Sequence, residues 1–205
     1  HVLTLADGSS WRFVGRNEGG RLIVSRLAWM LGLQKEGVRE SRDRDPHRSR
    51  EIRVHVSKKV IRWQTLPDDR GPVVDCRVGR FDSRDRLILQ MVRASQPVVH
   101  GAERNGGLLV HGALAEWNGI GVILCGPSGI GKSTASKRLP RAWRSLSDDA
   151  SLIVRTDDGA YWAHPWPTWS RCRQPGSTPS WEVRGGIRLG QICMPGRARL
   201  LTGSP

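Results

Sequence analysis

One segment, residues 107–139, constrains the fold more than any other part of the chain. Two apolar runs, 108–117 and 120–125, are joined by Asn118-Gly119. A type I′ turn needs positive φ at both central residues, and Asn-Gly supplies this readily. The sequence therefore predicts a β-hairpin with Trp117 opposite Ile120 and, further along the same register, His111 opposite Gly126.

The second strand of this hairpin runs directly into a glycine-rich segment. The segment matches the pattern G-x-x-x-x-G-K-[ST] with the residues Gly126-Pro127-Ser128-Gly129-Ile130-Gly131-Lys132-Ser133, followed by Thr134. Backbone amides of such a loop converge on phosphate oxygens, and the helix that follows adds its positive end. Lys132 is expected to reach the terminal phosphates and Ser133 to offer its hydroxyl to Mg²⁺. A strand before the loop and a short helix after it, over 132–139, favour a nucleoside triphosphate site over a plain glycine-rich turn.

Two neighbouring carboxylates, Asp148 and Asp149, follow a predicted strand over 143–146. A short helix that leads away from the phosphate loop and a strand that returns toward it bring this pair to the phosphate end of the sheet. One carboxylate can hold magnesium, and the other can accept the proton of an attacking hydroxyl. The alternatives are a solvated acidic turn or a helix N-cap. His111 is a phosphate contact, a residue that orients the catalytic acid, or a histidine of the core.

The remaining elements are expected from periodicity and turn signals. We expect a hairpin around Asp7-Gly8, a helix over 22–33, a loop over 36–50, a turn at 68–72 and a helix over 85–99. Strands are expected over 52–56, 60–63 and 152–155, with a turn at 157–159. Residues 163–170, rich in Trp and Pro, are interpreted as a stiff loop that binds a peptide or a base, or that packs on the surface.

Amino-acid composition limits the classes of binding partner and the cellular compartment that fit this chain. The net charge is +14, and 33 basic residues include only five lysines, which indicates either a coding bias toward arginine or an acidic partner. Nucleic acid binding rests on charge alone and is not favoured. No apolar run reaches the roughly 18 residues of a membrane span. The four cysteines form no C-x-x-C pair, so we expect a reduced, cytoplasmic protein without zinc. A homo-oligomer is left open.

Three motifs resemble the catalytic core of bacterial HPr serine kinases. They are Val110-His111-Gly112-Ala113, the run 121–133, and Ser147-Asp148-Asp149. A later stretch, Glu182-Val183-Arg184-Gly185, is similar to the E-[IV]-R-G signature of that family. The opening Leu-Ala-Asp-Gly and the His-Pro-Trp-Pro stretch are most similar to HPr-kinase-related proteins of peptide natural-product clusters. These include the SynChlorMet cassette protein ScmC and the kinases that modify lasso-peptide precursors.

The resemblance implies an α/β fold with a P-loop HPr kinase/PEP carboxykinase-like mixed sheet core over 106–205 and a smaller α+β region over 1–105. The same resemblance implies that His111 contacts the terminal phosphate and the acidic side chain of the site, and that Asp148 is the catalytic base. It also implies that Asp149 supports magnesium and that Glu182 supports it from farther away. Thr134 replaces the Glu of HPr kinases, which does not favour reverse phosphorolysis or an HPr substrate. Such relatives usually continue further, so a truncated C-terminus is expected.

The sequence therefore predicts an ATP- and Mg²⁺-dependent kinase that transfers the γ-phosphate to a hydroxyl, a Ser of a peptide or protein. Residues 1–105 are expected to recognise the substrate. Three alternatives stay open: a small-molecule kinase, a carboxykinase-like enzyme, and a nucleotide-binding regulator or cassette scaffold without transfer activity.

Overall fold

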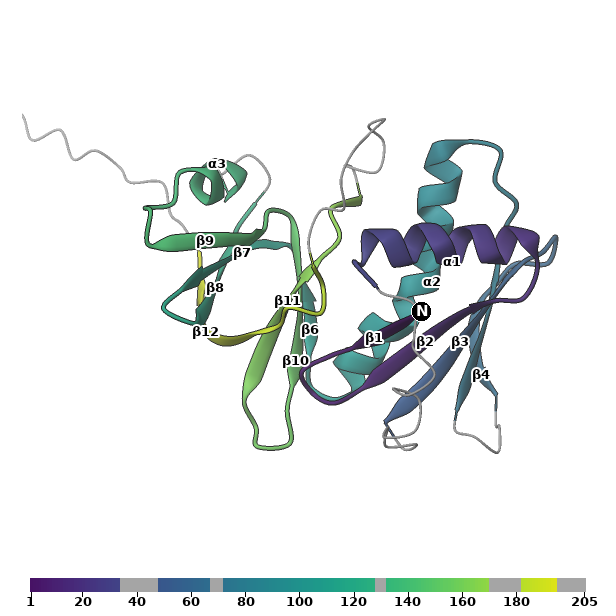
Figure 1. Ribbon diagram of the computed structural model, residues 1–205, viewed down its shortest axis with the longest axis horizontal. Coiled ribbons are helices and arrows are strands. Elements are labelled where there is room, and N and C mark those ends of the chain that lie inside the picture. Colours follow the sequence, from purple (N-terminus) through teal and green to yellow (C-terminus); the bar gives the residue numbers. More distant parts are fainter. Residues whose placement is uncertain (34–47, 67–71, 128–131, 170–181, 195–205) are drawn as a thin grey trace, which may run out of the picture.

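A long helix, α2 (Arg84–Arg104), packs against strands of two different β-sheets. The computed structural model describes residues 1–33, 48–66, 72–127, 132–169 and 182–194 (Figure 1). Within these ranges the chain is α/β, with two sheets and few helices. The described helices include none that combines the length and the apolar character needed to cross a membrane.

The first sheet has the strand order β1-β2-β3-β5-β4. Its strands are β1 (Val2–Thr4), β2 (Ser10–Gly15), β3 (Ser49–Val56), β4 (Ile61–Leu66) and β5 (Val73–Val78). The expected hairpin at the N-terminus is confirmed, because β1 and β2 pair antiparallel. Strands β2, β3 and β5 are parallel, and β5 is buried between β3 and β4. Strand β5 was not predicted from the sequence. The expected loop and turn fall mostly on 34–47 and 67–71, outside the described residues.

Two helices cover this sheet, and each begins at a capping side chain. Helix α1 (Glu18–Met30) begins four residues before the expected start, because Asn17 accepts a hydrogen bond from the Gly20 amide at 2.9 Å. It ends before Gly32, whose φ is +64°. Helix α2 begins after Ser83, which accepts from the Arg86 amide at 3.3 Å, and it continues past Pro97.

Proline at position 97 cannot donate to the Arg93 carbonyl one turn earlier. The Cys76 thiol of β5 lies 3.9 Å from that carbonyl and donates to it instead. Burial raises the pKa of Cys76 to about 12, so the thiol keeps the proton that this contact uses. The helix therefore tolerates its internal proline where it rests on β5.

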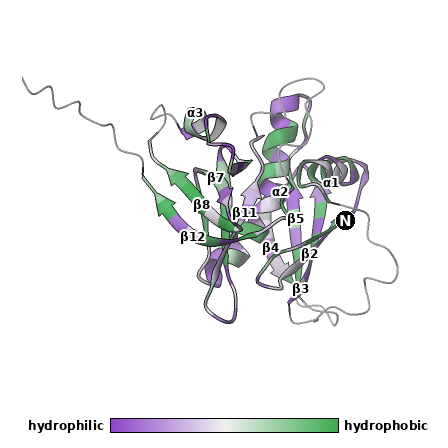
Figure 2. Cartoon of the chain, turned by 60° about the vertical axis from the view of Figure 1, so that its left-hand side comes forward, coloured by the Kyte–Doolittle hydropathy of each residue, from purple (hydrophilic) through white to green (hydrophobic). Residues whose placement is uncertain are grey.

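The second sheet has the order β6-β10-β11-β12-β8-β7-β9. Its strands are β6 (Leu108–Val110), β7 (Gly112–Trp117), β8 (Ile120–Cys125), β9 (Trp143–Ser147), β10 (Ala150–Arg155), β11 (Tyr161–Trp166) and β12 (Ile187–Cys193). Strand β12 pairs parallel with β8 and antiparallel with β11. Figure 2 shows hydrophobic residues along β8 and β12. The short helix α3 (Lys132–Lys137) follows β8 and contacts β7.

The interpretation of residues 163–170 as a loop was wrong for the first half of this segment. Residues 163–166 belong to β11, which pairs with β10 on one side and β12 on the other. Trp166 is buried, and Trp162 and Trp169 pack against the same core. Pro165 is tolerated although it cannot donate to the ladder, so the aromatic residues serve packing here.

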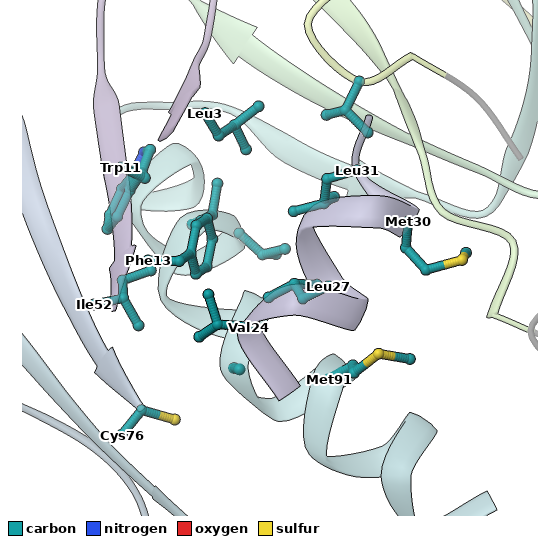
Figure 3. Packing of buried hydrophobic residues seen from close by; sticks show 14 of the residues in the cluster. Leu3, Trp11, Phe13, Val24, Leu27, Met30, Leu31, Ile52, Cys76 and Met91 are labelled. Atoms are coloured by element: carbon teal, nitrogen blue, oxygen red, sulfur yellow. The ribbon is translucent and has the colours of Figure 1, made fainter. Parts of the chain in front are cut away.

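The largest hydrophobic cluster joins both halves of the chain. It contains residues of the first sheet, α1 and α2, together with Leu152, Val154, Trp166 and Val183. Figure 3 shows its centre, where Trp11, Phe13 and Leu27 pack together. A second, smaller cluster around Leu114 and Ile123 lies within the second sheet. The expected domain boundary after residue 105 falls between the two sheets. Because residues from both sides of this boundary share the main core, the division into two domains remains a prediction.

Candidate active site

The hairpin of β7 and β8 has the register that the sequence predicts. Trp117 pairs with Ile120 and Gly112 with Cys125, across a turn in which Asn118 and Gly119 have φ of +48° and +77°. The ladder ends at Gly112 and Cys125, and His111 follows on one strand as Gly126 follows on the other. The histidine is therefore positioned by the hairpin at the start of the phosphate loop.

Only the two ends of that loop lie within the described residues. Ser128, Gly129, Ile130 and Gly131 fall outside them, as does the side chain of Ser133. Lys132 is buried, and its Nζ donates to the carbonyls of Gly126 at 2.6 Å and Pro127 at 3.1 Å. The ammonium group thus lies against the first residues of the loop, while Thr134 is exposed on α3.

The thiol of Cys125, which directly precedes the loop, is buried. Cys125 is 8% exposed, and burial raises the pKa of its thiol against the opposing charge of Lys132. The thiol therefore keeps its proton near neutral pH and acts as a small packing group beneath the loop.

The segment 108–117 differs from the single strand that was expected, because it is interrupted at His111. Strand β6 pairs with β10, with Val110 opposite Ser151, whereas β7 pairs with β9, with Leu114 opposite Ser147. Three residues separate Val110 from Leu114 along one strand, and three residues separate Ser147 from Ser151 along the other. The same antiparallel register therefore continues across the interruption as far as Leu114 and Ser147, and it shifts by one residue between Leu114 and Ala115. We call the antiparallel pairing of residues 108–117 with 143–155 the long ribbon.

The interruption of the long ribbon is where the candidate acidic residues lie. Asp148 and Asp149 connect β9 to β10, directly across from the connection between β6 and β7. His111 Nδ1 lies 3.3 Å from Asp149 Oδ1, and both side chains are partly exposed. The structure thus brings His111 to Asp149, the carboxylate predicted to support magnesium, and not to the predicted base.

Two serines replace the missing backbone hydrogen bonds of the interruption. The Leu114 amide donates to Ser147 Oγ at 3.2 Å, Ser147 Oγ contacts Ser151 Oγ at 3.2 Å, and Ser151 Oγ donates to the Gly112 carbonyl at 3.2 Å. Both serines are fully buried. We call this chain of hydroxyls the serine relay. It connects the two sides of the long ribbon next to Asp148 and Asp149, and the two aspartates themselves lie outside the ladder of paired residues.

Asp148 is held by a residue that sequence reasoning missed. Thr168 Oγ1 donates to Asp148 Oδ1 at 2.7 Å, and Thr168 is 5% exposed. The available signals were hydroxyl side chains beside apolar residues: Ser147 after Leu146, Ser151 at the start of an apolar run, and Thr168 between Trp166 and Trp169. None of these residues reveals its hydrogen-bond partner until the fold is known.

Glu182, which is also predicted to support magnesium, lies in the described segment that leads into β12. Its carboxylate is largely exposed and pairs with Arg184 at 3.2 Å. The described residues contain no group of three or more His, Cys, Asp or Glu side chains that could hold a metal ion. The neighbouring Val183 is buried, and its carbonyl accepts a hydrogen bond from His164 of β11 at 2.7 Å. The segment that contains Glu182 is therefore fixed through Val183.

A family model for the SynChlorMet cassette protein ScmC matches residues 57–200, which is more than half of the chain. The chain belongs to the ScmC family. The match includes the complete second sheet and the phosphate loop, and it also includes α2 and β5 of the first half. The resemblance found in the motifs thus agrees with a match over a much longer stretch.

Shorter stretches of this ScmC family member are similar to curated HPr kinase/phosphorylases. The protein from Streptococcus thermophilus strain LMD-9 is 42% identical over 57 residues, which is 27% of this chain and 18% of the relative. That from Peptoclostridium acidaminophilum is 50% identical over 50 residues, which is 24% of this chain and 16% of the relative. The chain thus covers less than a fifth of these relatives.

Proposed function

We propose that this protein is an ATP- and Mg²⁺-dependent kinase that transfers the γ-phosphate to a hydroxyl, a Ser of a peptide or protein. Its second sheet then serves as a P-loop HPr kinase/PEP carboxykinase-like core. The observation that carries the proposal is the interruption of the long ribbon, which gathers His111, Asp148 and Asp149 next to the loop that ends in Lys132. Similarity to HPr kinase/phosphorylases supports the same reaction class.

The two aspartates are proposed to have different roles, because they have different partners. Asp148 accepts a hydrogen bond from buried Thr168, which fixes its carboxylate for proton abstraction from the acceptor hydroxyl. Asp149 pairs with His111, so one of its oxygens faces an imidazole and the carboxylate remains partly exposed. His111 then either orients Asp149 or contacts the terminal phosphate.

The oxygen donors present fit magnesium. In nucleotide sites this ion is usually held by one or two carboxylates, substrate phosphates and water, and a cage of protein ligands is not needed. The exposed carboxylate of Asp149 and the hydroxyl of Ser133 would hold it, and Glu182 would act at a greater distance. When bound, the ion would neutralise charge on the phosphates. Lys132 and the loop amides, from Gly126 to Thr134, would hold the nucleotide.

Replacing Asp148 tests the proposal. We expect Asp148→Asn to bind a fluorescent ATP analogue as the wild type does but to transfer label from γ-labelled ATP to a Ser peptide at least about 100-fold more slowly, since general base catalysis contributes about this much. Asp82→Asn, at an exposed aspartate paired with Arg86, is the matched control and should transfer normally.

Full transfer activity in Asp148→Asn would contradict the assignment of the base. If the wild type binds ATP and hydrolyses it slowly but labels no peptide, the nucleotide-binding regulator or scaffold becomes the better interpretation. Label on a small molecule alone would favour a small-molecule kinase.

A further inference from the structure

Two cavities lie along the first sheet, one where this sheet meets the β10–β11 turn and the other between this sheet and α2. One has a volume of about 490 Å³, and the other about 280 Å³. Arg50 and Asn105 line both cavities, so the two adjoin and are treated as one region of the surface. We call it the arginine–tryptophan groove and define it by residues that line it: Trp11, Arg48, Arg50, Trp63, Arg104 and Arg155.

The groove has a surplus of positive charge. Four arginines line it against two aspartates, Asp7 and Asp157. The Asp7 carboxylate is buried and accepts hydrogen bonds from the Ser9 amide at 2.9 Å and the Ser9 hydroxyl at 2.6 Å. Asp157 pairs with Arg48.

The other three arginines of the groove are not neutralised. Within the described part of the chain, Arg50, Arg104 and Arg155 form no ion pair. Arg155 and Arg104 are exposed, so their guanidinium groups can reach a bound molecule. A recess lined in this way favours carboxylates or other anions, which guanidinium groups bind through paired hydrogen bonds.

The smaller cavity adds a rigid apolar wall. The Arg50 guanidinium lies 5.0 Å from the ring centroid of Trp11, and that ring packs on Gly101 of α2, where a Cβ would come within 2.5 Å. Trp63 contacts the His100 ring at a centroid distance of 5.0 Å. Aromatic walls held by their neighbours bind an apolar side chain at little entropic cost.

The groove is remote from the phosphate loop, and β10 connects the two places. Asp149 directly precedes β10, and Arg155 is its last residue. A strand of this length spans about 20 Å at about 3.3 Å per residue. A ligand in the groove therefore cannot be at the reacting phosphate, whereas an extended peptide of at least about six further residues can reach from one to the other.

We propose that the arginine–tryptophan groove docks an acidic segment of the peptide substrate, with an apolar residue of that segment against Trp63. The proposal rests on the proposed function only for the claim that the acceptor is a peptide. Nucleic acid fits the groove less well, because Trp11 is 3% exposed beneath Arg50 and cannot stack on a base.

Fluorescence anisotropy with the full chain tests the docking. The probe is a fluorescein-labelled decapeptide with four Glu and two Leu, and the control probe has Gln in place of each Glu. We expect the acidic probe to bind at least about tenfold more tightly than the control, and Arg155→Gln and Arg104→Gln each to weaken it about tenfold, since charged hydrogen bonds contribute this much. Arg86→Gln, an exposed arginine outside the groove, is the matched control and should bind as the wild type does.

Equal binding of both probes, or equal binding by all three variants, would overturn the proposal, as would competition by single-stranded RNA at lower concentration than by unlabelled acidic peptide. Unchanged binding of a fluorescent ATP analogue shows that a weakened variant is still folded. The measurement needs no phosphoryl transfer. If the wild type binds the acidic probe but labels no peptide, the proposed kinase activity is refuted and the docking proposal stands. If the wild type labels a peptide but does not bind the acidic probe, only the docking proposal is refuted.

Discussion

His164 connects three parts of the chain through its two ring nitrogens. Its Nε2 accepts from the Ala6 amide at 3.1 Å, and its Nδ1 donates to the Val183 carbonyl at 2.7 Å. These partners assign the proton to Nδ1 and require a neutral ring. The residue is 1% exposed, and burial lowers its pKa from the ordinary value of 6.5, against smaller opposing effects of Val183 and Asp7.

This histidine predicts a loss of stability in mild acid. A lowered pKa means that the folded state binds fewer protons than the unfolded state, so the stabilisation is complete above the unfolded pKa of about 6.5 and declines as the pH falls toward the folded value. We expect the melting temperature to drop between about pH 7 and pH 5, where histidines titrate. His164→Gln should be less stable at pH 7 but have a flatter profile. Parallel profiles for the two proteins would assign the acid sensitivity to other groups.

At the scale of elements, the serine relay predicts a linked loss of stability and activity. Ser151→Ala removes a hydroxyl that donates to Gly112 and contacts Ser147, and it leaves buried polar atoms without a partner. We expect a loss of about 1–3 kcal/mol in the free energy of unfolding, measured by urea denaturation. Phosphoryl transfer should fall as well, because the relay holds the connection that carries Asp148 and Asp149.

A buried serine elsewhere provides the control for the relay. Ser95 of α2 donates to the Val92 carbonyl of its own helix at 2.8 Å. Ser95→Ala should cost less than about 1 kcal/mol, because only a local hydrogen bond within a helix is lost. Equal losses for Ser151→Ala and Ser95→Ala, with transfer unaffected in both, would show that the relay does not position the aspartates.

The packing of α1 on β3 depends on a close approach at Gly20. A Cβ at this position would lie 2.2 Å from the Val54 carbonyl oxygen and 3.1 Å from the capping oxygen of Asn17. We expect Gly20→Ala to destabilise by about 1–3 kcal/mol despite the better helix propensity of alanine. Gly185→Ala, where a Cβ would meet its nearest atom at 3.4 Å, should be nearly neutral in the same urea titration.

The elements that the sequence predicted are those that local chemistry determines. Asn118-Gly119 sets its own turn geometry, so the hairpin and its register were predicted to the residue. Strand β5 and the residues of β11 were missed because their conformation depends on burial between other strands. The contact of His111 with Asp149, and that of Asp148 with Thr168, could not be derived, because each needs the pairing of distant strands.

At the scale of the whole molecule, the shared hydrophobic cluster predicts a single unfolding transition. Leu152, Val154 and Trp166 of the second sheet are buried in the same cluster as Leu3, Trp11 and Phe13 of the first. Neither half can unfold without exposing the core of the other. Calorimetry should therefore give equal calorimetric and van't Hoff enthalpies, and a fragment of residues 106–205 should show no cooperative melting. Two separate transitions would show instead that the halves are independent domains.

The position of β12 has a consequence for how the protein is made. This strand follows all the others of its sheet in the chain, yet it lies between β11 and β8. Until residues 187–193 leave the ribosome, both of those neighbours present an open edge that can pair with other nascent chains. The strand that leads into the phosphate loop is among those left unprotected. A stall in translation before residue 187 would therefore produce an aggregation-prone chain, although every residue of the phosphate loop had already been synthesised.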